Sequence, residues 1–297
     1  MTGSRLLKLP LPQKRYDPAR KTKKASAGDR GDKWQLESEA ACAAEDIKRA
    51  QLLCRSARSM DDPKIKAEAM ALAEILGEGA DSNRCSSTLA SSLYWRELRR
   101  NIIGNLLAFI DRHVTGDLYL FTIISPHWEI PGGKLLSTEL KQIVKSLEND
   151  LRRVRGSNES HFIFAVIHGQ YDPIRNVYSI HFHGIACEAA IESVRSLRTL
   201  KCYKKSDFIA KPIVTEKIYD LPRVLSYCLQ TYWDQKNYMC SDTGEVRRRS
   251  LKSRITGLSH SLYLLKMHDS ELSDLILMCG FTAMSAGFSP SRIRSKS

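Results

Sequence analysis

The stretch Tyr178-Ser-Ile-His-Phe-His-Gly-Ile-Ala places two histidines in an apolar run whose residue types are typical of a β-strand. In a strand, side chains two residues apart project from the same face of the sheet. His181 and His183 are therefore expected to project together, while Phe182 points into the core from the other face. Two imidazoles placed in this way can bind one metal ion, and Gly184 allows a close backbone approach beside them.

The segments around this strand have strand or helix periodicity. The predicted strands are 118–124, 161–167 and 211–219, and the predicted helices are 135–154, 189–200 and 221–233. A Gln170-Tyr-Asp-Pro turn separates segment 161–167 from the histidine strand, which predicts an antiparallel hairpin. The order of the elements predicts an α+β fold with a central antiparallel sheet and helices on one face.

The regions on either side of the sheet are predicted to be mostly helical. Residues 37–78 and 88–113 have helix-forming composition, and the second segment has a basic side that includes Arg99 and is expected to face solvent. Residues 1–36 hold ten lysines and arginines against three acidic residues, which predicts a disordered arm. We therefore expect a disordered basic tail (1–36), a helical N-terminal region (37–115), a central domain (116–236) and a helical C-terminal region with a basic tail (237–297).

The composition favours a nucleic-acid partner. The 297 residues carry a formal net charge of +13, and such an excess attracts nucleic acid first and an anionic membrane surface second. No apolar run approaches the roughly 20 residues of a membrane span, and no apolar signal-peptide core follows the basic N-terminus. The eight cysteines form no CxxC pair, which argues against a zinc ribbon and fits a reducing cytoplasm. These features predict a cytoplasmic protein with no membrane partner.

Three short motifs follow one another along the chain: Phe121-Thr-Ile-Ile-Ser-Pro, His181-Phe-His and Tyr227-Cys-Leu-Gln-Thr-Tyr. Together they resemble the motifs of the HUH endonuclease superfamily, in which U is a hydrophobic residue. Because the tyrosines follow the histidines, the chain is similar to replication initiators of rolling-circle plasmids and phages rather than to conjugative relaxases. The resemblance covers residues 116–236. Cupins and other metal proteins also use His-X-His strands, so the histidines alone do not select this family.

The resemblance implies a tyrosine nucleophile, and helical geometry separates two candidates. Tyr232 lies near the centre of the apolar stripe of the predicted helix, so we expect it in the core. Tyr227 lies off the stripe with Arg223 and Gln230, and we predict that it is the nucleophile. Gln230 stands where the family often has a lysine. This departure leaves open weaker activation, a substitute cation such as Lys236, or loss of the activity.

The metal site implied by the resemblance has His181 and His183 as ligands. Its third ligand comes from the neighbouring strand, where His168 is our choice and Gln170 and Asp172 are alternatives. Imidazole ligands in general suit Zn, Cu, Fe or Ni. The resemblance implies Mg²⁺ or Mn²⁺ as the divalent cofactor, and Mn²⁺ reconciles the two arguments more easily.

The resemblance also implies the reaction and its partners. The enzyme would nick and rejoin one strand through a phosphotyrosine intermediate and so start rolling-circle replication. Its substrate would be single-stranded or extruded DNA at an origin, with host replication proteins as further partners. The basic candidates for DNA contact are Arg223, Lys236, Arg247, Arg248 and Arg249, and the aromatic candidates are Trp128, Trp233 and Tyr238. A non-catalytic DNA-binding protein of the same fold and an HUH single-tyrosine transposase are the alternatives.

Overall fold

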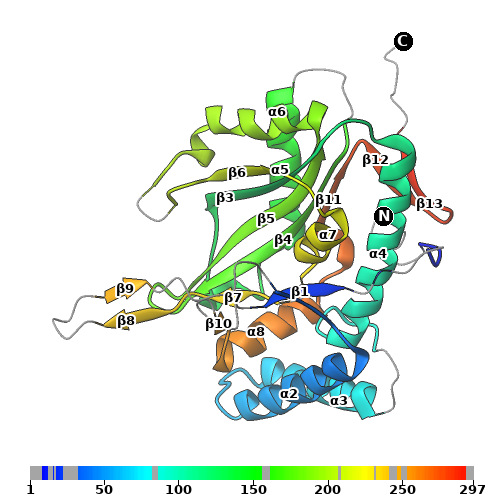
Figure 1. Ribbon diagram of the computed structural model, residues 1–297. Helices are drawn as coiled ribbons and strands as arrows, with labels where there is room; N and C mark the ends of the chain where they lie inside the picture. Colours follow the sequence, from blue (N-terminus) through cyan, green and yellow to red (C-terminus); the bar gives the residue numbers. More distant parts are fainter. Residues whose placement is uncertain are drawn as a thin grey trace.

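Strands β4 (Ile163–Asp172) and β5 (Val177–Cys187) form the antiparallel hairpin that the sequence predicts, at the centre of the molecule (Figure 1). Asn176 in the connecting turn has a φ of 50°, a left-handed conformation that asparagine adopts more readily than most residues. Every residue of β4 is buried, because this strand is paired along both edges. A computed structural model describes residues 9–12, 16, 18–22, 33–81, 86–155, 161–206, 209–230, 232–240, 246–248 and 253–291.

The hairpin belongs to a seven-stranded sheet with the order β10-β7-β4-β5-β3-β6, in which β11 also pairs with β4. The other strands of this sheet are β3 (Leu118–Pro131), β6 (Ile213–Lys217), β7 (Asp234–Gln235), β10 (Ser253–Arg254) and β11 (Ile276–Cys279). β7 pairs with β4 in parallel, because helix α7 (Leu221–Cys228) carries the chain from the edge strand β6 back to β4. The α+β class is confirmed, and the sheet is mixed rather than wholly antiparallel.

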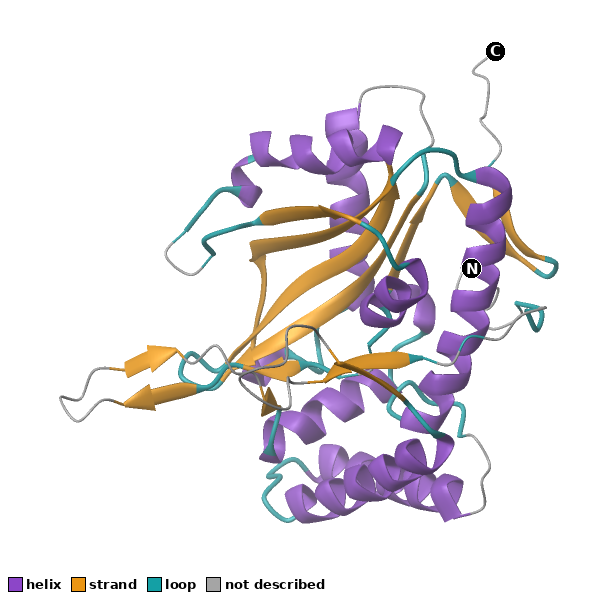
Figure 2. Ribbon diagram, in the orientation of Figure 1, coloured by secondary structure: helices purple, strands orange, loops and turns teal. Residues whose placement is uncertain are grey.

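Helices cover both faces of this sheet (Figure 2). On one face, Phe182 contacts Trp128, and Trp128 contacts Tyr203, whose hydroxyl donates to Asp150 of helix α5 (Leu140–Arg155). Helix α7 packs on the opposite face, where the side chain of Tyr227 meets His183. Helices were expected on one face only, but they cover both faces. The histidines lie on the face that α7 covers.

Close packing at Gly184 explains why a glycine follows the two histidines. A Cβ atom at this position would lie 2.4 Å from Cζ of Phe121 and 2.5 Å from the carbonyl oxygen of Phe164. Both distances are well below van der Waals contact, so a larger residue would push β3 and β4 away from β5. Glycine here holds the three central strands together beside the histidines.

The N-terminal region is helical as predicted. The helices of this and the later regions are α2 (Glu39–Ala57), α3 (Pro63–Asp81), α4 (Ser92–His113), α6 (Glu188–Ser196) and α8 (Gly257–His268). Buried Asp46 of α2 accepts hydrogen bonds from the Ser91 hydroxyl and from the backbone N–H groups of Ser92 and Leu93. The carboxylate thereby caps α4 and fixes it to α2.

Two terminal segments differ from the predictions. Within 1–36, strands β1 (Ala19–Thr22) and β2 (Lys33–Leu36) form an antiparallel pair, so the expectation of disorder is wrong for these residues. The C-terminal region was expected to be helical, but β11 lies within it and joins the central sheet. Strands β12 (Phe281–Met284) and β13 (Gly287–Pro290) follow as a hairpin, and β8 (Tyr238–Cys240) and β9 (Val246–Arg248) form another.

The first sequence motif also continues further than expected. Its strand was predicted over residues 118–124, yet β3 runs on to Pro131. The register of β3 against β5 shifts between Ile124 and Glu129, so Pro126 lies in an irregular segment where a missing N–H is tolerated. Among the described helices, none has the length and apolar character needed to cross a membrane.

Candidate metal and tyrosine site

Three histidines converge on the face of the sheet beneath α7. His168 of β4 is the cross-strand partner of His181 in β5, and His183 follows two residues later on the same face. Potential ligand atoms of the three side chains all lie within 4.8 Å of one another. His168 and His183 are buried, and His181 is half-buried. The antiparallel register thus brings the predicted third ligand beside the predicted pair.

Of the two alternative third ligands, Asp172 has other partners. It is buried, and its carboxylate accepts hydrogen bonds from Lys236 Nζ at 3.1 Å and from the Tyr238 hydroxyl at 2.8 Å. Burial by itself would raise the pKa of Asp172, but these hydrogen bonds outweigh it and hold the pKa below its usual value. Gln170 is buried opposite Ser179, two residue pairs beyond His168 and His181.

Hydrogen bonds to carbonyl oxygens show which nitrogens of two rings carry the lone pair. A carbonyl oxygen only accepts, so His168 donates from Nε2 to the Cys228 oxygen, 2.7 Å away. His181 likewise donates from Nδ1 to the carbonyl oxygen of Ser179, 3.4 Å away. In neutral rings this leaves Nδ1 of His168 and Nε2 of His181 as electron-pair donors for a cation.

The third ring, His183, lies between two hydroxyl groups. Its Nδ1 is 2.8 Å from Oγ1 of Thr122, its cross-strand partner on β3. Its Nε2 is 3.0 Å from the hydroxyl oxygen of Tyr227 on α7. The threonine orients the ring, and the tyrosine hydroxyl lies beside the nitrogen that points away from β3.

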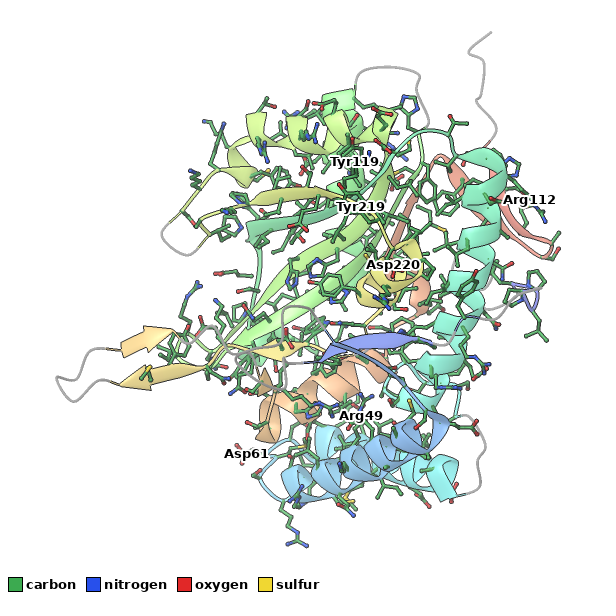
Figure 3. The ribbon with its side chains drawn as sticks, viewed as in Figure 1. Arg49, Asp61, Arg112, Tyr119, Tyr219 and Asp220 are labelled. Carbon is green, nitrogen blue, oxygen red and sulfur yellow. The ribbon has the colours of Figure 1, made fainter. Side chains whose placement is uncertain are left out.

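Helix α7 presents Tyr227 to this cluster. The helix begins after Asp220, whose side chain accepts a hydrogen bond from the backbone N–H of Arg223, and Figure 3 shows Tyr219 and Asp220 at this end. The centroid of the Tyr227 ring is 4.6 Å from that of His183. Burial, followed by nearby negative groups, raises the pKa of the Tyr227 hydroxyl above its usual value. The phenol is therefore neutral at pH 7.

Tyr227 contacts His183, but the reason for expecting Tyr232 in the core was wrong. The helix was expected to reach Trp233, whereas α7 ends at Cys228, so Tyr232 is not on its apolar stripe. Tyr232 is only half-buried, and the guanidinium of Arg254 lies 5.6 Å from its ring centroid. Gln230 is half-buried just after the helix, and its N–H donates to the carbonyl oxygen of Tyr227 at 3.3 Å.

Arg99 supports the tyrosine helix from behind, which the sequence did not predict. Its side chain was expected in solvent but is fully buried, and it forms an ion pair with Glu37. Nη2 donates to the carbonyl oxygen of Ser226, 2.9 Å away, immediately before Tyr227. A cation at the C-terminal end of α7 also interacts favourably with the helix dipole. The role of Arg99 had no signal in the sequence, and Thr122 was marked only as part of the first motif, because both roles depend on tertiary register.

The predicted DNA contacts have different outcomes. Arg223 is exposed beside Asp220, whereas Lys236 is buried against Asp172, which corrects its prediction as a surface contact. Arg247 and Arg248 lie on β9, where the structure describes the backbone, and Arg249 lies outside the described residues. The aromatic candidates serve the fold: Trp128 and Trp233 are buried in the core, and Tyr238 bonds to Asp172.

Comparisons of the chain with protein-family models, with curated proteins and with solved structures find no match in any of the three.

Proposed function

We propose that this protein is a metal-dependent DNA strand transferase of the HUH type, which nicks and rejoins one DNA strand as a replication initiator does. The observation that carries the proposal is the contact between the Tyr227 hydroxyl and Nε2 of His183, within a cluster of three histidines. A nucleophile beside a cation site that binds the same phosphate is the arrangement that this chemistry needs. The three motifs that resemble HUH endonucleases supply all but one of these residues.

The reaction is a transesterification in which Tyr227 is the nucleophile. Its phenolic oxygen forms a bond to phosphorus, and the bond from phosphorus to the 3′ oxygen breaks. The tyrosine proton ends on the 3′ oxygen, leaving a free 3′ hydroxyl and a phosphotyrosine link to the 5′ end. The bond energy is retained, so the reverse reaction rejoins the strand.

The donor atoms fit a divalent cation. Nδ1 of His168, Nε2 of His181 and Nε2 of His183 would hold it from one side of the sheet. Once bound, the cation would polarise the scissile phosphate and stabilise negative charge on its oxygens. Between Mg²⁺ and Mn²⁺, the two ions that the resemblance to HUH endonucleases implies, imidazole nitrogens suit Mn²⁺ better, so we propose Mn²⁺ as the physiological metal, with Mg²⁺ as a weaker substitute.

Two neighbours position the reacting groups. Thr122 fixes the orientation of the His183 ring, and Arg99 holds the end of α7 that carries Tyr227. Both act through residues that would touch the substrate rather than on the substrate itself. Precise placement of this kind is a large part of catalysis by proximity.

The substrate is single-stranded DNA or a strand extruded from an origin. The net charge of +13 and the exposed Arg223 beside α7 support attraction to a phosphate backbone. We also propose a cytoplasmic location, since described cysteines such as Cys42, Cys187 and Cys228 are free thiols.

A covalent-adduct assay tests the proposal. A pool of labelled hairpin oligonucleotides with randomised loops is incubated with the full chain and Mn²⁺, and the products are separated under denaturing conditions. We expect labelled DNA to remain attached to the protein, and a chelator to abolish the adduct. Binding of the pool without any adduct, at all metal concentrations, would instead support a non-catalytic DNA-binding protein of this fold.

A further inference from the structure

A cleft lined by basic side chains lies away from the histidines, between α2 and the first turn of α8. Its cavity volume is about 620 Å³. Lys48, Arg49 and Arg55 line it from α2, and Arg254 and His260 line it from the chain around the start of α8. Figure 3 labels Arg49 in this region, between the two helices.

Positive charge dominates the walls of this cleft. Glu45 is the carboxylate of the lining, and it is shared by two guanidinium groups, those of Arg49 and Arg254. Lys48 and Arg55 are exposed on the same side of α2, where they add positive charge that Glu45 does not offset. The lining thus has four basic side chains against one acidic group.

Arg49 makes part of this wall rigid. Its side chain is 3% exposed, and its Nη1 donates to the carbonyl oxygen of Ala90 at 2.6 Å. Holding a charged group in place before a ligand arrives reduces the entropy that binding costs. Arg49 therefore contributes a fixed positive charge to this wall without rearrangement of α2.

The opposite wall supplies hydrogen-bond donors. Helix α8 starts at Gly257, and the side chain of Thr256, its N-cap residue, makes no capping hydrogen bond. The first N–H groups of a helix have no intrahelical acceptor, and Thr256, Gly257 and Leu258 line the cleft. Burial and the nearby Arg49 and Arg254 lower the pKa of His260 to about 4, so its ring is neutral at pH 7 and can donate one hydrogen bond.

We infer that this cleft binds a phosphate group. Basic side chains from α2 and donor groups from the start of α8 approach the same volume from two sides, which suits a tetrahedral oxyanion. The phosphate belongs to a DNA backbone or to a small phosphorylated ligand, and the chemistry of recognition is the same for both. This inference does not depend on cleavage at the histidine cluster.

The test follows the His260 ring by NMR while the full chain is titrated at constant ionic strength, without divalent metal. One arm uses inorganic phosphate and the other a short oligothymidylate. We expect a saturable change of the His260 resonance in at least one arm. A response to both ligands identifies a general phosphate site, and a response to the oligonucleotide alone identifies a contact with the DNA backbone.

Two double variants separate the cleft from general electrostatic attraction. Lys48→Gln with Arg55→Gln removes two exposed cations of the lining, and Lys66→Gln with Lys145→Gln removes two exposed cations of α3 and α5. We expect the first pair to weaken binding about tenfold and the control pair to change it less than about twofold, since exposed charges at a distance are screened. Equal weakening by both pairs, or no saturable response in the wild type, would overturn the inference. Because no cleavage is measured, failure here leaves the proposed nicking activity standing, and the reverse also holds.

Discussion

His168 donates a hydrogen bond from Nε2 to the carbonyl oxygen of Cys228, with 2.7 Å between the two atoms. One imidazole ring therefore belongs both to the histidine cluster and to the end of the helix that carries Tyr227. Nε2 of this ring bonds to the end of α7, and Nδ1 is the nitrogen left for the cluster. Because the ring is rigid, the distance between these two nitrogens is fixed. We expect metal affinity and tyrosine position to change together when His168 is replaced.

Tyr227→Phe is expected to abolish covalent DNA–protein adducts while leaving DNA affinity nearly unchanged, because only the hydroxyl is lost. It should also preserve or tighten Mn²⁺ binding, since the hydroxyl and a cation need the same nitrogen of His183. Adduct formation on denaturing gels and calorimetric titration with Mn²⁺ measure the two effects. Tyr232→Phe is the matched control and should be mild. An adduct that disappears only in the control would identify Tyr232 as the nucleophile.

Replacing His181 and His183 together by alanine should remove Mn²⁺ binding and cleavage. Folding should largely survive, with a loss of about 1 kcal/mol for each hydrogen bond given up, such as that with Thr122. Mn²⁺ should raise the melting temperature of the wild type and not that of the double variant. A double variant that still cleaves DNA would show that the metal site lies elsewhere.

Phe182→Ala, on the same strand, should lower stability and leave the metal site intact. This ring is fully buried against Trp128, so its loss should destabilise the domain by about 3–5 kcal/mol. The histidines project from the other face and remain chemically intact. Chemical denaturation should therefore show the loss, while Mn²⁺ affinity per folded molecule stays near that of the wild type.

Lys236 and Arg223 should separate stability from DNA binding. Lys236→Met breaks the buried ion pair with Asp172 and should lower the free energy of unfolding by about 3–5 kcal/mol. Arg223→Ala removes an exposed cation beside α7, so it should weaken binding to single strands and make it less salt-dependent, at little cost in stability. Denaturation curves and salt titrations check the two. A reversed pattern would restore Lys236 as a DNA contact.

The His260 ring should make the protein less stable in acid. The unfolded chain takes up this proton near pH 6.5, whereas the folded chain takes it up only near pH 4. Between these values the unfolded state binds more protons, so stability should fall as the pH falls from about 6.5 to about 4, by at most about 3 kcal/mol. His260→Gln should flatten this part of the profile. The measurement is chemical denaturation from pH 7 to pH 4 in phosphate-free buffers. Parallel stability profiles for the wild type and the His260→Gln variant would contradict this prediction.

Local patterns predicted the elements but not their ends or surroundings. The shared face of His181 and His183 followed from alternation, because each strand has a period of two residues. The hairpin followed from the turn signal between the strands, although the connection lies at 173–176 and Gln170 to Asp172 belong to β4. The early end of α7 did not, since Leu229 continues the apolar spacing after the hydrogen-bonded helix has stopped. The burial of Arg99 was missed for a related reason. A charged residue in a helix is usually solvated, and only packing against Glu37 and α7 makes its burial favourable.

The pairing of β11 with β4 has a consequence for how the protein is made. Ile276 pairs with Val166, about 110 residues earlier in the chain. During translation, β4 leaves the ribosome long before its partner has been synthesised, and one edge of this central strand, which is buried in the folded protein, stays open meanwhile. Exposed strand edges of this kind recruit other chains. Production of this protein should therefore respond to chaperone supply and growth temperature, through nascent chains that wait for residues 276–279 to complete the sheet.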